Sequence, residues 1–243
     1  MSGSSDAPSA QAPLRVVLLG PPGAGKGTQA AWMARDHGLV KISTGDILRE
    51  AVAHGTRLGR QIQSRIEAGN LVGDSTMVEI VQDRLALPDA QNGYVLDGFP
   101  RTTPQARALD AMIAGEPGHL TVLLIDVPFE ELVRRLQARR VCGRCGRNAD
   151  PGLPEGIRCS RCGGMYVTRV DDSDGVVRQR LTVYLEETEP LVTYYKERPT
   201  FFKIDGFQPP AAVTAQVRDA LLQSRQLAMD GTVRAEGPGV DTR

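Results

Sequence analysis

This chain of 243 residues is poor in several features that mark particular protein classes. Lys plus Arg and Asp plus Glu both number 29, so the net charge is zero, whereas duplex-binding proteins usually carry a basic excess. Aromatic residues make up only 5%, which disfavours the stacking surfaces of single-strand-binding proteins. No apolar run approaches the roughly 20 residues that cross a bilayer. The composition therefore indicates neither a nucleic-acid-binding nor a membrane-spanning protein.

Both ends of the chain lack apolar patterning. Residues 1–13 have neither the basic start nor the apolar core of a signal peptide, so we expect a disordered tail and a cytoplasmic protein. We expect a second flexible tail over residues 229–243. The whole chain is 41% hydrophobic and 24% charged, which is ordinary for a globular protein with one α/β core and room for insertions.

A glycine-rich segment, Gly20–Thr28, joins an apolar run to a helical pattern and reads Gly-Pro-Pro-Gly-Ala-Gly-Lys-Gly-Thr. Its glycines let backbone N–H groups approach phosphate oxygens, the helix start adds partial positive charge, and Lys26 adds a full charge. Gly27 stands where the general pattern has Ser or Thr, so a loop hydroxyl bound directly to Mg²⁺ is in doubt. The segment predicts a nucleoside-triphosphate site.

Short apolar runs alternate with longer helical patterns. The expected strands cover residues 15–19, 39–42, 94–96, 121–125 and 201–204. The expected helices cover residues 26–37, 44–54, 57–68, 75–86, 104–114, 129–139, 175–195 and 210–226, and Pro190 should kink or divide the seventh. This alternation predicts an α/β fold with a parallel sheet and helices on both faces. The phosphate loop, Ser43–Asp46 and Asp97–Arg101 each follow a strand, so they should converge at the carboxyl edge of the sheet.

Four cysteines form a C-x₂-C-x₁₃-C-x₂-C pattern, made of Cys142, Cys145, Cys159 and Cys162. Four thiolates in two such pairs suit the tetrahedral geometry of Zn²⁺, with iron and cobalt as open alternatives. No position is left for water, so the metal should be structural. Disulfides are the other interpretation, and a cytoplasmic location disfavours them. The surrounding stretch lacks a long periodic segment, so we expect a small inserted subdomain that the metal stabilises.

Together these motifs closely resemble the adenylate kinases of the long-lid, zinc-containing type, from Leu14 to about Leu222. The matching segments are Gly20–Thr28, Ser43–Arg49, Leu71–Val72, Leu96–Thr102 with Gln105, Arg139–Arg140, Arg169–Asp172 and Arg178–Arg180. The resemblance implies a P-loop NTPase fold with a five-stranded parallel sheet, core segments 14–43, 74–139 and 178–228, a helical AMP-binding insertion over 44–73 and a zinc lid over 140–177. It also implies reversible transfer of a phosphoryl group from Mg·ATP to AMP, giving two ADP, by a monomeric enzyme.

The resemblance also assigns roles to individual residues. The ATP side would consist of Gly23, Ala24, Gly25, Lys26, Gly27, Thr28, Arg135, Arg139 and Gln208, with Arg135 packed on the adenine. The AMP side would consist of Thr44, Arg49, Val72, Gly98, Arg101, Gln105, Arg169 and Arg180. The catalytic set would be Lys26, Arg101, Arg139, Arg169 and Arg180, with Asp97 orienting Mg²⁺ through water. Asp171 and Asp172 would belong to the lid hinge and pair with its arginines.

The chemistry of the reaction supports these roles independently. The second pKa of a phosphate monoester is about 6, so the acceptor is already a nucleophile at neutral pH and needs no general base. Catalysis instead needs in-line positioning and positive charge on the transferring oxygens. Arginine suits this need because its planar fork binds two oxygens and keeps its proton. Gln105 can both donate and accept, which suits an adenine edge and favours AMP over UMP or CMP.

Three alternatives remain open from the sequence alone. The first is another nucleoside monophosphate kinase with a pyrimidine or guanine acceptor, which an acceptor panel would separate. The second is a zinc-ribbon nucleic-acid-binding ATPase that uses Arg144, Arg147, Arg158 and Arg161, which the zero net charge disfavours. The third is a structural metal-binding protein with a vestigial nucleotide site, which the presence of Lys26 and every expected arginine disfavours.

Overall fold

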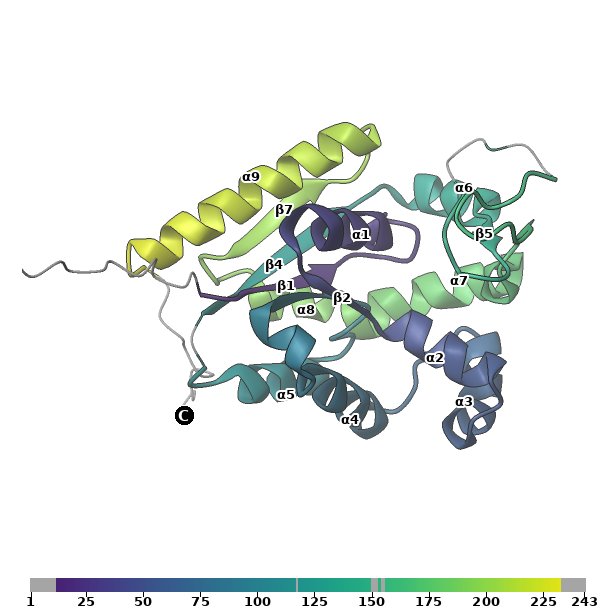
Figure 1. The fold of residues 1–243 in the computed structure, drawn as a ribbon, viewed down its shortest axis with the longest axis horizontal. Helices are drawn as coiled ribbons and strands as arrows, with labels where there is room; N and C mark the ends of the chain where they lie inside the picture. The colour runs from purple at the N-terminus through teal and green to yellow at the C-terminus, as the bar shows by residue number, and fades with distance from the viewer. Residues whose placement is uncertain (1–11, 117, 150–152, 154–155, 233–243) are drawn as a thin grey trace, which may run out of the picture.

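The computed structural model describes residues 12–116, 118–149, 153 and 156–232, so the expected tails lie largely outside the described residues. Its centre is a sheet of five strands in the order β2-β3-β1-β4-β7 (Figure 1). The strands are β1 (Leu14–Leu19), β2 (Val40–Ser43), β3 (Gly93–Asp97), β4 (His119–Asp126) and β7 (Phe201–Asp205). Every neighbouring pair runs parallel, which confirms the predicted α/β class and the five strands.

Helices cover both faces of this sheet. They are α1 (Lys26–His37), α2 (Thr44–Ala53), α3 (Arg57–Glu67), α4 (Asp74–Leu85), α5 (Thr103–Ile113), α6 (Phe129–Ala138), α7 (Asp174–Val183), α8 (Pro190–Tyr195) and α9 (Pro210–Met229). Two 3₁₀ turns, η1 (Pro88–Asn92) and η2 (Val170–Asp172), connect longer elements. The helix expected over 175–195 is divided, because a π-helical turn, η3 (Tyr184–Thr188), separates α7 from α8 just before Pro190.

The core has two layers that β1 separates. Val16 and Leu18 pack into a cluster with apolar residues of α1 and α9, whereas Val17 and Leu19 face a cluster with residues of α4 and α5. All four side chains are buried, because successive residues of a strand point to opposite faces and each face carries helices. The unbroken apolar sequence of β1 is the signature of this arrangement.

Two insertions project from one end of the molecule (Figure 1). One consists of α2 and α3. The other contains an antiparallel pair, β5 (Val141–Cys142) and β6 (Tyr166–Val167), which sequence periodicity could not reveal because each strand has only two residues. Residues 150–152 and 154–155 of this second insertion lie outside the described residues. Within the described part of the chain, every helix is too short or too polar to span a bilayer.

Candidate active site

The segment between β1 and α1 forms a phosphate-sized cradle of backbone. Gly25 caps α1 with a left-handed φ of 99°, and no side chain caps the first N–H groups of that helix. A Cβ at Gly20, where φ is 138°, would lie 2.5 Å from the carbonyl oxygen of Ile125. Glycine is therefore required at both places, and the free N–H groups of the helix start make an anion site.

The ammonium group of Lys26 lies across this loop. Its Nζ donates to the carbonyl oxygens of Gly20 at 2.6 Å and Pro21 at 2.9 Å. Burial lowers the pKa of Lys26 to about 8; the charge of Asp97 opposes this shift, and nearby arginines add to it. The loop thus holds a cation whose charge an incoming phosphate would stabilise.

Asp97 ends β3 beside the phosphate loop. A Cβ added to Gly27 would lie 3.3 Å from Asp97 Oδ2, which is closer than ordinary van der Waals contact. The carboxylate therefore crowds the position where the general phosphate-loop pattern carries Ser or Thr. The hydroxyl one residue later, on Thr28, belongs to an exposed side chain. This geometry gives a physical reason for the glycine that follows Lys26.

Three arginines from different segments converge on two buried carboxylates. Arg139 binds Asp172 through both its Nε, at 2.7 Å, and an Nη atom. Arg169 donates from Nε to Asp171 at 2.8 Å. Arg180 donates to Asp172 Oδ1 at 2.7 Å and lies 3.3 Å from Asp171 Oδ2. The expected pairing of Asp171 and Asp172 with arginines is therefore present.

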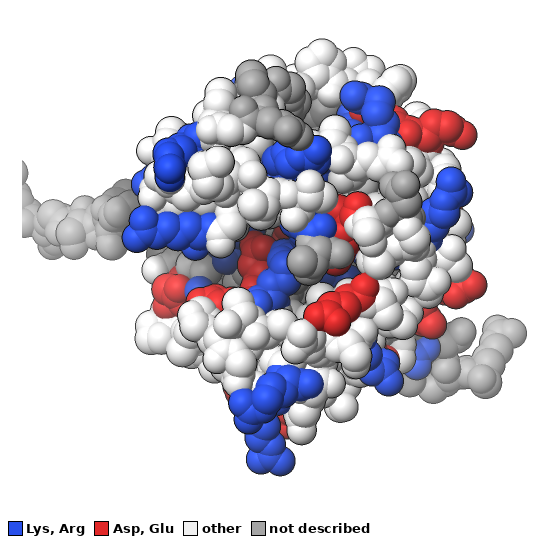
Figure 2. All heavy atoms as spheres, turned by 90° about the vertical axis from the view of Figure 1, so that its right-hand side faces the viewer, with Lys and Arg blue, Asp and Glu red and all other residues white. Residues whose placement is uncertain are grey.

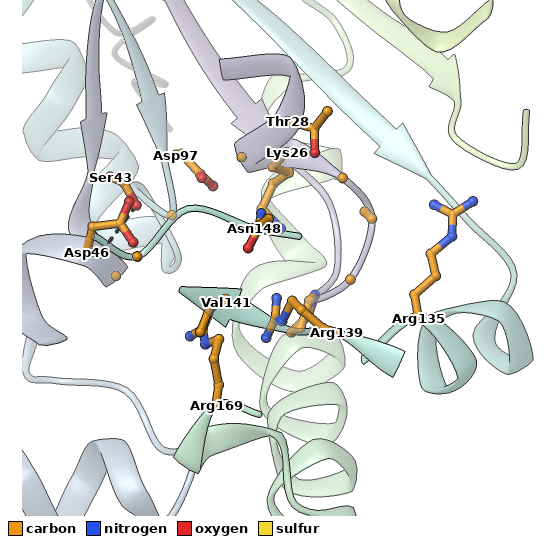
Figure 3. A pocket seen from close by; sticks show the side chains of 18 of the residues that line it. Lys26, Thr28, Ser43, Asp46, Asp97, Arg135, Arg139, Val141, Asn148 and Arg169 are labelled. Carbon is orange, nitrogen blue, oxygen red and sulfur yellow. Dashed lines mark hydrogen bonds between the residues drawn. The ribbon is translucent and has the colours of Figure 1, made fainter. Parts of the chain in front are cut away.

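Burial disfavours the charged form of both the carboxylates and the arginines in this cluster. Burial opposes the charge of Asp171, yet the hydrogen bond from Arg169 and the charges of neighbouring arginines hold its pKa well below the usual range. Burial lowers the pKa of Arg180 to about 10, so its guanidinium stays protonated at neutral pH. In Figure 3, Arg139 and Arg169 lie on the same side of Lys26 as Asn148, and the charges of Arg139 and Arg180 act on Lys26. The cluster is therefore a set of paired charges beside the phosphate loop.

Arg101 is fixed at three points in the turn after β3. Its Nε donates to the carbonyl of Gly98 at 2.8 Å, and its backbone N–H donates to Gln105 Oε1 at 2.8 Å. Its carbonyl accepts from the hydroxyl of Thr188 at 2.9 Å. Burial lowers the pKa of Arg101. Arg49 lies nearby, hydrogen-bonded to Asp46.

A small pocket lies between the α2–α3 insertion and the core. Its apolar walls are Leu48, Ile66, Leu71, Val72 and Met77. Its polar lining includes Thr44, Arg49, Arg101, Gln105 and Arg180, so six of the eight predicted AMP-side residues meet here. The Thr44 hydroxyl donates to the carbonyl of Gly98 at 2.8 Å. Apolar walls with a few fixed polar groups are typical of a base-binding pocket.

A wider crevice continues from this pocket past the phosphate loop to the lid (Figure 2). Predicted residues that line it are Gly23, Ala24, Gly25, Lys26, Gly27, Thr28, Arg49, Asp97, Gly98, Arg101, Arg135, Arg139, Arg169, Arg180 and Gln208. Figure 2 shows basic and acidic side chains next to one another at its centre. Arg135 lies apart from the other labelled residues in Figure 3. Its guanidinium donates to the carbonyl oxygen of Gly206 at 3.0 Å, and Gly206 lies two residues before Gln208.

Sequence reasoning missed two polar residues that support this site. Thr188 donates to the carbonyl of Arg101, and Asp74 accepts from Thr102 at 2.9 Å and from Gln105 at 2.7 Å. Thr188 lies in the π-helical turn, and Asp74 is the first residue of α4. An acidic residue at a helix start and a threonine two residues before a proline are both ordinary, so no local signal separated them from structural residues.

The four cysteines of the lid form one compact cluster. Their Sγ atoms all lie within 4.8 Å of one another, with 3.4 Å between Cys142 and Cys162 and 3.7 Å between Cys145 and Cys159. Four sulfurs at about 2.3 Å from a central Zn²⁺ would be about 3.8 Å apart. None of the four forms a disulfide. The cluster therefore fits a tetrahedral metal ion, and the disulfide interpretation does not describe this structure.

The sheet order, the cradle between β1 and α1 and the arginine-lined crevice define a P-loop nucleotide phosphotransferase. The sequence model of the adenylate kinase family matches residues 18–200. This chain belongs to the adenylate kinase family.

Relatives named adenylate kinase align with this chain over nearly their whole length. The protein from Moorella thermoacetica is 46% identical over 214 residues, which are 86% of this chain and 98% of the relative. The protein from Kosmotoga olearia is 46% identical over 208 residues, or 84% and 97% of the two chains. The protein from Streptomyces avermitilis is 42% identical over 214 residues, or 86% and 97%.

Proposed function

We propose that this enzyme transfers the γ-phosphoryl group of Mg·ATP to AMP, in a reversible reaction that gives two ADP. One observation carries this proposal: a phosphate loop and five arginines from separate segments line a single crevice that leads into a pocket with apolar walls. The five are Arg49, Arg101, Arg139, Arg169 and Arg180. A donor and an acceptor phosphate both need such charge, and the pocket offers room for the base of the second nucleotide.

The two nucleotides would occupy different ends of this crevice. The loop residues Gly23–Thr28 would hold the ATP phosphates, while Arg135 and Gln208 would flank the donor adenine, because both lie near the chain segment that follows β7. Thr44, Val72, Gly98 and Gln105 would surround the AMP base and sugar, and the supporting observation is the pocket beside them. Arg49 and Arg101 would bind the AMP phosphate.

The reaction would proceed by positioning and electrostatic stabilisation. The AMP phosphate attacks directly, since it is already ionised, and Lys26, Arg101, Arg139, Arg169 and Arg180 would stabilise the charge of the transferring group. In this structure the last three bind Asp171 or Asp172. A bound phosphate would replace Asp171 and Asp172 as the partner of these arginines. The arginines would then surround the transferring group only when nucleotide is bound, which limits transfer of the phosphoryl group to water.

The two insertions would close over the nucleotides. We assign residues 140–177 as the lid over ATP and residues 44–73 as the flap over AMP, because both border the crevice. The remaining segments, 14–43, 74–139 and 178–228, would form the core. Closure of both insertions would expel water before transfer.

Two metals fit the residues present. Mg²⁺ bound with ATP would supply charge neutralisation of the phosphates, and Asp97 would orient it through water from the end of β3. Zn²⁺ in the cysteine cluster would hold the lid rigid, because four sulfur ligands leave no position for a reacting group. The surrounding lid has little buried apolar surface of its own, since Cys142, Cys159 and Val177 are its only fully buried apolar residues among those described.

We further propose that the enzyme works as a monomer in the cytoplasm and does not bind nucleic acid. The zero net charge supports the last of these assignments.

The direct test is a coupled assay for ADP formed from ATP plus AMP, with metal analysis of the same preparation. We expect ADP production that requires both nucleotides and Mg²⁺, and about one zinc per chain. A panel of UMP, CMP and GMP in place of AMP tests the acceptor. ATP consumption that proceeds equally well without any acceptor would refute the proposed transfer.

A further inference from the structure

Asp74 and Gln105 form a hydrogen-bonded pair at the wall of the small pocket. Gln105 lines the pocket and its side chain is almost completely buried, whereas Asp74 lies behind it at the start of α4. The Gln105 Nε2 donates to Asp74 Oδ1 at 2.7 Å, and its Oε1 accepts from the backbone N–H of Arg101 at 2.8 Å. Each end of the amide therefore has one partner inside the protein.

These two partners determine which way the Gln105 amide points. An ionised carboxylate can only accept a hydrogen bond, and a backbone N–H can only donate one. If the amide were turned by 180°, its oxygen would face the Asp74 carboxylate and its NH₂ group would face the Arg101 N–H. Both hydrogen bonds would be lost inside the protein, where unpaired polar groups are strongly unfavourable.

The fixed amide keeps one free donor and one free acceptor. A primary amide has two N–H donors and two acceptor lone pairs, and Asp74 and Arg101 each use one. A 6-amino purine such as adenine presents an acceptor at N1 and a donor at N6, which this remaining pair can satisfy. A 6-oxo purine presents the reverse, a donor at N1 and an acceptor at O6, and would need the turned amide.

Thr102 also helps to fix the position of the Asp74 carboxylate. Its hydroxyl donates to the same Asp74 oxygen at 2.9 Å and accepts from the Gln105 backbone N–H at 3.4 Å as the cap of α5. The Asp74 carboxylate therefore links the start of α4 to the start of α5, and it takes part in both hydrogen bonds as the acceptor. The orientation of Gln105 follows from the fold of these two helices.

We propose that Asp74 is a positioning residue for acceptor specificity: by fixing the Gln105 amide, it makes the pocket select 6-amino over 6-oxo purine monophosphates. This inference rests on the proposed function. It predicts that wild-type protein uses AMP at least about a hundredfold better than inosine 5′-monophosphate, by kcat/KM, because the 6-oxo base leaves both amide groups mismatched. The two acceptors carry the same sugar and phosphate and differ at N1 and C6 of the base.

The test replaces Asp74 by a residue that can either donate or accept. Asp74→Asn keeps the shape, and Asp74→Ser keeps a residue that suits a helix start. Either side chain can donate to a turned Gln105, so only the Arg101 N–H still opposes the turned amide. We expect the AMP-to-inosine-monophosphate ratio of kcat/KM to fall about tenfold or more in both variants, chiefly through KM.

The matched control is Asp83→Asn, which removes the same charge from an exposed position on the same helix. It should leave the ratio unchanged. If the role of Asp74 were purely structural, its loss would lower activity with both acceptors equally. A change in the electrostatic potential at the acceptor phosphate would also affect both acceptors equally, because they carry the same phosphate. Calorimetric titration of each monophosphate into each variant repeats the comparison without turnover.

Several results would overturn the inference. One is an unchanged ratio in a folded Asp74 variant, and another is an equal loss with both acceptors. A third needs only the wild type: use of inosine monophosphate within about threefold of AMP would mean that no amide orientation is selected. Failure of the proposed function itself would look different, because wild-type protein would then transfer no phosphoryl group to AMP.

Discussion

Loss of the Asp172 carboxylate should weaken the buried ion cluster that joins Arg139 to Arg180. Its side chain is fully buried and binds both Arg139 and Arg180, whose side chains are 19% and 17% exposed. The change Asp172→Asn keeps the shape but leaves Arg139 without its carboxylate partner and leaves Arg180 with only Asp171, at 3.3 Å. Removal of one partner of a buried ion pair typically costs about 3–5 kcal/mol.

The partial exposure of both arginines reduces this figure, because solvent can stabilise part of their charge. We therefore expect a loss of about 2–3 kcal/mol in the free energy of unfolding. For a chain of this size, each kcal/mol shifts Tm by about 2–4 °C, so the Tm should fall by roughly 4–12 °C. Differential scanning calorimetry and urea unfolding measure the two quantities separately.

The control is Asp126→Asn, because Asp126 pairs with Lys203 at 2.7 Å while both side chains are more than half exposed. An exposed pair of this kind contributes about 0–1 kcal/mol. Saturating ATP should reduce the difference between Asp172→Asn and wild type, because phosphate oxygens can replace the missing carboxylate. If Asp172→Asn unfolds within about 0.5 kcal/mol of the Asp126 control, this reasoning about the buried cluster is wrong.

Three further predictions concern the site and the lid. Arg101→Ala should lower kcat by about a thousandfold while ATP still binds, because the variant removes charge from the transferring group and leaves the phosphate loop intact; single-turnover kinetics and ATP titration measure these effects. Removal of metal by a chelator should lower the Tm, because a metal bound by the four cysteines would hold the lid together but take no part in phosphoryl transfer; calorimetry before and after zinc is restored measures this. ATP binding should weaken as pH rises through about 8, because Lys26 loses its proton there in the free protein and the anionic phosphates favour its charged form; calorimetry in buffers of different ionisation enthalpy should detect proton uptake between pH 8 and 9.

Each of these predictions has a control and a contrary outcome. Arg107→Ala, an exposed change on α5, is the control for Arg101, whose assigned role would be refuted by near-normal turnover. Thermal stability that does not change after the metal is removed would contradict a structural role of the cluster. Proton release on ATP binding at pH 8.5 would contradict the assignment of Lys26. Because burial lowers the pKa of Lys26 in the free protein and phosphate should raise it again, we expect proton uptake.

Local sequence patterns predicted most of the elements of the site. The phosphate loop, the turn that carries Arg101 and the cysteine spacing are each encoded within a few residues, so their backbone geometry depends little on distant parts of the chain. Periodicity also predicted the five strands to within a few residues. It missed the π-helical turn that carries Thr188, because the sequence there continues an ordinary helical pattern and only tertiary packing selects the wider turn.

The partners of polar side chains were far less predictable. Gln105 was recognised as able to donate and accept, but the groups that use up half of that capacity come from α4 and from the turn after β3. Asp74 lies 31 residues before Gln105 in the chain, so no local pattern links the two. The resemblance did predict that Asp171 and Asp172 pair with arginines, but only the structure showed that Asp172 joins Arg139, at the end of α6, to Arg180 in α7.

By itself, the sequence determined the chemistry that this protein carries: a backbone cradle for phosphate, five arginines distributed over several segments and four thiols spaced for a metal. Those features depend on residue type and short-range spacing, which the chain states directly. Only the tertiary structure decided how the groups face one another, including the insertion of β3 between β1 and β2 and the direction of the Gln105 amide. The reason is physical: the orientation of a polar group depends on which donors and acceptors surround it, and folding brings those together from distant parts of the chain.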